Sequence, residues 1–75
     1  MQKYEFLLTK MRDKDVRRFA DILAHLPERN RDIVLATLKG ETQTSISLRL
    51  DMKQGNVSRT LKATMVEIGR RLRGE

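Results

Sequence analysis

The sequence predicts an all-α protein, a small bundle of four to five helices that contains a helix-turn-helix. The chain of 75 residues has only 4 glycines and 1 proline, so few residues interrupt a helix. Its β-branched residues do not form the alternating runs of half-buried strands, whereas its apolar residues recur at spacings of three and four. At this length we expect a single domain, residues 1–75.

The N-terminal part, residues 1–26, is expected to form one or two helices. In the segment from about Gln2 to Met11, apolar residues with helical spacing are Tyr4, Leu7, Leu8 and Met11. Asp13 or Asp15 can then cap a second helix. The apolar stripe of that second helix consists of Val16, Phe19, Ala20, Leu23 and Leu26. One longer helix remains an alternative, because no residue between the two segments forbids it.

Pro27 indicates where the next helix begins. Proline disfavours helical geometry at the residue before it and fits the first turn of a new helix. We therefore expect a helix from about Pro27 to Leu38, followed by Gly40 as its C-terminal cap. The expected buried side of this helix consists of Ile33, Val34, Ala36 and Leu38.

The next stretch has the spacing of a helix-turn-helix. A short helix, about Gln43–Leu50, is expected to begin behind an N-cap at Thr42. A turn leads to a second helix that starts at Lys53 or Gln54 and extends to about Leu72. The residues expected to be buried in this motif are Ile46, Leu50, Met52, Val57 and Leu61.

Several residues of the motif have a defined steric role. Ser47 is small enough for the point where the two helices cross, and Met52 fills the space between them. Asp51 occupies the turn and tolerates a left-handed backbone better than most residues other than glycine. Lys53 stands where a serine or threonine cap is favoured, at a cost of about 1 kcal/mol. Gly55 also costs about 1 kcal/mol inside a helix, and either close approach of DNA or crowding between helices explains it.

The charge distribution favours a polyanionic partner. The formal net charge is +6, and the first half of the chain mixes both signs. From position 49 to 73 the only acids are Asp51 and Glu67. The basic residues in that range are Arg49, Lys53, Arg59, Lys62, Arg70, Arg71 and Arg73.

These features predict a domain that binds double-stranded DNA through the major groove. The residues suited to reading base edges are Gln54, Asn56, Ser58 and Arg59. The residues suited to holding phosphates are Gln43, Thr44, Ser45, Arg49, Lys53 and Lys62.

At these residues the chain resembles a known family. The segment from Leu26 to about Arg73, roughly two thirds of the chain, resembles the helix-turn-helix of bacterial sigma factor region 4. The resemblance rests on the Leu-Pro-Glu-Arg start at Leu26 and on the G-x-V-S signature at Gly55–Ser58. Among stand-alone proteins it is similar to plasmid repressors of the TrfB/KorA type, through Gly40, Gln43, Leu50, Gly55, Val57 and Ser58. This resemblance implies a dimeric transcriptional repressor that binds a palindromic operator, with residues 27–73 as the region-4-like part.

A homodimer is also expected on physical grounds, because one recognition helix reads too few base pairs to be specific. Two apolar faces are candidates for the dimer contact. They can pack on each other within one chain, but we favour mutual packing with exchange across a dimer. The first is the N-terminal face of Tyr4, Leu7, Leu8 and Met11. The second is a short seam with coiled-coil spacing, formed by Leu61, Met65, Ile68 and Leu72.

Other classes of function are less favoured by the sequence. We expect no metal, cofactor or small-molecule substrate and no enzyme, because the chain has no cysteine, one histidine (His25) and no glycine-rich phosphate loop. No apolar run is long enough to cross a membrane and no signal peptide is evident, so a cytoplasmic protein is expected, and the resemblance implies a bacterial one. RNA binding is disfavoured because no aromatic residue lies in the basic region. A module that contacts RNA polymerase or another regulator remains the alternative.

Overall fold

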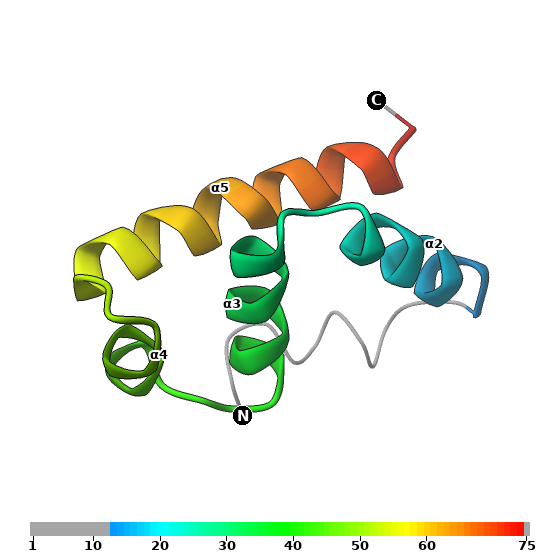
Figure 1. Ribbon diagram of the computed structural model, residues 1–75. Coiled ribbons are helices and arrows are strands. Elements are labelled where there is room, and N and C mark those ends of the chain that lie inside the picture. The colour runs from blue at the N-terminus through cyan, green and yellow to red at the C-terminus, as the bar shows by residue number, and fades with distance from the viewer. Residues whose placement is uncertain (1–12, 75) are drawn as a thin grey trace.

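The computed structural model describes residues 13–74, and it is all-helical over that range, as the sequence predicts (Figure 1). Its helices are α2 (Asp13–Ala24), α3 (Glu28–Leu38), α4 (Gln43–Leu50) and α5 (Gln54–Leu72). The bounds expected for the last two helices are confirmed. The helix expected at positions 2–11, its apolar face of Tyr4, Leu7, Leu8 and Met11, and its possible continuity with α2 lie outside the described residues.

The long helix α5 extends along one side of the molecule and contacts each of the other three described helices. Figure 1 shows α4 beneath its N-terminal end, α3 near its middle and α2 near its C-terminal end. Short connections link these helices, and α3 also contacts α4. One side of α5 is therefore covered by protein along most of its length.

The core lies between α5 and these three helices. In the helix-turn-helix, Ile46 and Val57 are completely buried, while Leu50 and Met52 pack against the core from its edge. Of the five positions expected to be buried in the motif, Ile46, Val57 and Leu61 are buried, whereas Leu50 and Met52 are only partly buried. The full cluster of buried apolar residues is Phe19, Ile22, Leu23, Leu26, Ile33, Val34, Ala36, Ile46, Val57, Leu61 and Ile68.

The predicted stripe of α2 was partly wrong. Phe19, Leu23 and Leu26 are buried as expected, but Val16 is 40% exposed and Ala20 is exposed. Ile22 takes part in the core instead. It lies three residues after Phe19 and so completes a face with Leu23 and Leu26 at helical spacing.

The two ends of α3 are set by a proline and a glycine. Pro27 is the N-cap of α3, with ψ of 145°, so the helix begins one residue later than predicted. Gly40 follows α3 with a positive φ of 97°, which glycine adopts without strain. The amide of Glu41 donates to the carbonyl of Ala36 at 2.9 Å, and that of Gly40 donates to Thr37 at 3.0 Å. This pair of bonds is a Schellman motif, which ends α3.

The turn between α4 and α5 has the geometry that the sequence predicts. The hydroxyl of Thr42 accepts a hydrogen bond from the amide of Ser45 at 3.1 Å, so it caps α4. Asp51 adopts the left-handed conformation, with φ of 53° and ψ of 49°. The amide of Met52 donates to the carbonyl of Ser47 at 2.9 Å, and Ser47 itself is only 8% exposed. Lys53 precedes α5 without a side-chain cap bond, as expected from its lack of an acceptor.

Candidate nucleic-acid interface

The first turns of α4 and α5 meet at one exposed corner of the molecule. There the side-chain amide of Gln54 donates a hydrogen bond to the hydroxyl of Thr44 at 2.9 Å. Both side chains are exposed to solvent. The bond therefore links a residue predicted to read bases with a residue predicted to hold a phosphate, and it limits the freedom of both.

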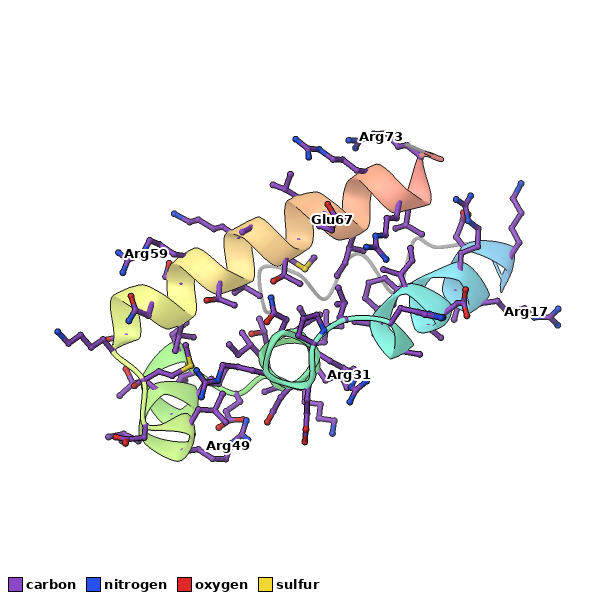
Figure 2. The ribbon with its side chains drawn as sticks, turned by 45° about the horizontal axis from the view of Figure 1, so that its top comes forward. Arg17, Arg31, Arg49, Arg59, Glu67 and Arg73 are labelled. Carbon is purple, nitrogen blue, oxygen red and sulfur yellow. The ribbon has the colours of Figure 1, made fainter. Side chains whose placement is uncertain are left out.

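A second polar pair lies just beyond, on α5. The guanidinium of Arg59 donates to the side-chain oxygen of Asn56, and both residues are exposed. An arginine side chain has five N–H donors, so most of them remain available to another acceptor. In Figure 2, Arg59 projects from the side of α5 that faces away from α3. Ser58, the fourth predicted base reader, is half-buried.

Two lysines flank these polar residues. Lys53 precedes the first turn of α5, and Lys62 lies one turn beyond Arg59. Both are exposed, and neither forms an ion pair with the described residues. The corner thus combines hydrogen-bonding side chains with positive charges that pair with no carboxylate of residues 13–74.

Arg49 was predicted to hold a phosphate, but in the structure its guanidinium is held by two carboxylates. Its guanidinium donates to both carboxylate oxygens of Asp32, each at 3.0 Å, and to those of Glu41 at 3.0 and 3.2 Å. We call these three residues the Arg49 clamp. The hydrogen bonds from Arg49 lower the pKa of both carboxyl groups, and the two carboxylates raise the pKa of Arg49. Two carboxylates already balance its charge, and they would repel a phosphate.

Ser45, another predicted phosphate ligand, is also engaged within the protein. Its hydroxyl donates to the carboxylate of Glu41 at 2.8 Å, and its amide donates to Thr42. Both of its donors are therefore engaged within the protein. Of the residues at the start of α4, Gln43 and Thr44 remain as candidates.

The predicted dimer seam on α5 is also corrected. Leu61 and Ile68 are each 2% exposed and belong to the core of this chain. Met65 and Leu72 are half-buried and pack against the same core. Leu61 and Ile68 are therefore not accessible to a second copy, and Met65 and Leu72 are only partly exposed.

The structure distinguishes between the two explanations offered for Gly55. A β-carbon at this position would meet only the end of the Arg59 side chain, at 3.7 Å, which is an ordinary contact. No atom of another helix lies within 4 Å of the added β-carbon, so crowding between helices does not require glycine here. Close approach of DNA, the other explanation, stays a prediction.

No protein-family model matches the chain, and comparisons with curated proteins and with solved structures give no match either. No helix among residues 13–74 is long and apolar enough to cross a membrane. In the same part of the chain, no three histidine, cysteine, aspartate or glutamate residues are grouped so that they could hold a metal ion.

Sequence reasoning missed Asp32 and Glu41 as partners of Arg49. Asp32 lies 17 residues before Arg49 and Glu41 lies eight before it. Neither separation brings side chains together on a single helix, where neighbours are three or four residues apart. Only the packing of α4 against α3 brings the three charges into contact.

We expect Arg49→Gln to lower the melting temperature at neutral pH by a few degrees and to leave DNA affinity nearly unchanged, because the clamp is structural. The ordinary pKa values of Asp32 and Glu41 are 3.8 and 4.5, and both are lowered in the fold. Their contribution to stability is therefore complete above those values and is lost as the pH falls through the lowered ones. Thermal unfolding followed by circular dichroism should show the difference between wild type and variant shrinking in acid.

The matched control is Arg29→Gln, which removes an exposed charge from α3 that has no carboxylate partner among the described residues. This variant should melt close to wild type at every pH. A normal melting temperature for Arg49→Gln, together with a clear loss of DNA affinity, would restore Arg49 as a phosphate ligand.

Proposed function

We propose that this protein is a sequence-specific DNA-binding transcriptional regulator that inserts the N-terminal half of α5 into the major groove. The observation that carries the proposal is the exposed corner where Gln54 bonds to Thr44 beside the Asn56–Arg59 pair. Base edges in the major groove present hydrogen-bond donors and acceptors that suit these side chains. The unpaired lysines on either side supply attraction to the phosphates.

Within this proposal the polar residues have separate roles. Arg59 binds guanine through two parallel N–H donors, and Gln54 binds adenine through its amide, each contributing about 1–3 kcal/mol of discrimination. The bond to Thr44 holds Gln54 in place before DNA arrives, so less side-chain freedom is lost on binding. Asn56 and Ser58 are secondary candidates, and Lys53 and Lys62 hold phosphates.

Gln43 and Thr44 position the domain on the DNA backbone. They form the first turn of α4, where backbone N–H groups lack partners within the helix. Such a helix start favours binding of a phosphate, and contacts of this kind fix the position of the protein along the DNA without reading its sequence.

The regulator most easily acts as a repressor, by occupying a promoter. The proposal assigns it no chemical reaction.

Contact with RNA polymerase or another regulator is the second candidate function. One observation favours it, because Leu48 on α4 is 78% exposed. A single exposed leucine is common on soluble proteins and does not form a patch. DNA binding therefore has the stronger support.

The first test separates base reading from phosphate binding. A preferred DNA site is first selected from random sequences with the wild-type protein. Arg59→Ala should then weaken binding to that site by roughly 5- to 150-fold, the equivalent of about 1–3 kcal/mol. It should change binding to a scrambled site much less. Electrophoretic mobility shifts at several salt concentrations measure both affinities.

Lys62→Ala is the matched variant on the same helix. It should weaken both DNAs by a similar factor and reduce the slope of log affinity against log salt by about 1. An equal loss on both DNAs for Arg59→Ala would show that Arg59 does not read bases. If the wild type fails to bind DNA at low salt, the protein-contact function is preferred.

A second test uses Gly55→Ala. The added methyl group meets open space apart from Arg59, so we expect it to stabilise the fold by up to about 1 kcal/mol. The same methyl group should weaken DNA binding, because it prevents the backbone of α5 from approaching the groove. Urea unfolding and the mobility-shift titration measure the two effects.

Gly69→Ala provides the comparison for stability, since its added β-carbon would also meet only an arginine side chain, Arg73 at 3.5 Å. It reports what helix propensity alone contributes to α5. A more stable Gly55→Ala variant with wild-type affinity would mean that DNA does not approach this turn.

The proposal includes a homodimer, because two recognition helices about 34 Å apart read two half-sites of a palindrome. Analytical ultracentrifugation at micromolar concentration should give a species of twice the 8.8 kDa chain mass. A purely monomeric species, free and bound to DNA, contradicts the dimer.

Leu61→Ala is expected to lower the free energy of unfolding by about 2–5 kcal/mol, since it opens the core.

A further inference from the structure

The outward side of α5 carries a continuous row of exposed residues, which extends well beyond the turns assigned to base reading. The row lies opposite the buried side of Val57, Leu61, Thr64 and Ile68. Figure 2 shows Arg59 and Arg73 projecting from the same side of α5, away from α3. We call this row the outer strip, and its members are Arg59, Lys62, Val66, Arg70 and Arg73.

The outer strip contains no acidic residue. The one acid of α5, Glu67, lies off the strip and pairs with Arg71, whose Nε donates to it at 3.0 Å. Lys62 and Arg70 form no ion pair with any described residue. At Lys62 and Arg70, therefore, no carboxylate of the described residues offsets the positive charge of the strip.

The length of α5 determines which parts of bound DNA these charges can contact. Its 19 residues span about 28 Å, whereas the major groove of B-DNA is about 12 Å wide. Arg70 lies 11 residues after Arg59, which is about 16 Å farther along the helix axis. When the first turns of α5 lie in the groove, its C-terminal half therefore extends to the sugar–phosphate backbone that borders the groove.

From this geometry we propose that Arg70 and Arg73, continuing from Lys62, form a second and sequence-independent contact with DNA phosphates. The contact extends the footprint of the domain beyond the bases read by the start of α5. It rests on the proposed function, since it requires α5 to lie on DNA. The ligand is the phosphodiester backbone, which arginine binds through charged hydrogen bonds.

A structural role for these arginines predicts a different outcome. Arg70 and Arg71 both lie in the last turn of α5, where a positive charge is favoured by the helix dipole. The dipole acts on both residues to a similar extent, whichever way they point. The dipole alone therefore predicts similar effects for the two residues. A DNA contact predicts different effects on DNA affinity, because Arg70 is on the outer strip, whereas Arg71 is off it and paired with Glu67.

The test compares Arg70→Gln with Arg71→Gln in the full chain. Arg70→Gln should weaken binding to the selected site and to the scrambled site by the same factor, roughly five- to tenfold at 0.1 M salt. It should also reduce the salt slope by about 1. Arg71→Gln should bind both DNAs like wild type, and Arg70→Lys should retain most of the affinity because it keeps the charge.

The other outcomes overturn the inference in identifiable ways. A loss for Arg70→Gln on the selected site alone would make Arg70 a base reader. Equal affinity of both glutamine variants with wild type, with only a small drop in melting temperature, would leave the helix dipole as the role of Arg70. In both cases a wild-type protein that binds DNA, and an Arg59→Ala variant that loses specificity, leave the proposed function standing.

Discussion

The burial of one side of α5 is the constraint on which the other features depend. Val57, Leu61 and Ile68 are covered by the three helices that α5 contacts, and this fixes how α5 is rotated about its axis. Because a helix presents its residues in a fixed angular order, burying that side forces Arg59 and Arg70 outward. The same core packing that stabilises a short chain therefore also orders its charges on the surface.

The position of α4 depends on weaker forces. This helix has only eight residues and buries Ile46 and Ser47, so it gains little stability from its own length. The Arg49 clamp adds an ionic link from α4 to α3, and the left-handed Asp51 fixes the path into α5. Since Gln54 bonds to Thr44, any movement of α4 displaces a candidate base reader directly. High salt, which weakens exposed ion pairs, therefore affects the position of α4 and with it the geometry of the candidate interface.

Local signals could be predicted from the sequence, whereas contacts between distant segments could not. Thr42 and Asp51 act within a few residues of themselves, through a cap and a turn, and both roles were predicted. Arg49 was predicted to hold a phosphate because the sequence shows its positive charge. The spacing along the sequence does not show that Asp32 on α3 is its partner. The seam through Leu61 and Ile68 was misassigned for the same reason. Its spacing shows which side of α5 is apolar, but only the fold shows that this chain's own helices cover it.

The net charge of the chain says less about binding than the pairing of individual cations. Arg49 and Arg71 are held by carboxylates, whereas Lys53, Lys62 and Arg70 have no ionic partner among the described residues. Lys53, Lys62 and Arg70 lie along α5 or just before it, and the hydrogen-bonding side chains gather at its N-terminal end. A single helix can therefore separate two requirements of DNA recognition. In the proposed complex, its start would supply the sequence-dependent contacts, and its outward length would supply affinity that is independent of sequence and sensitive to salt.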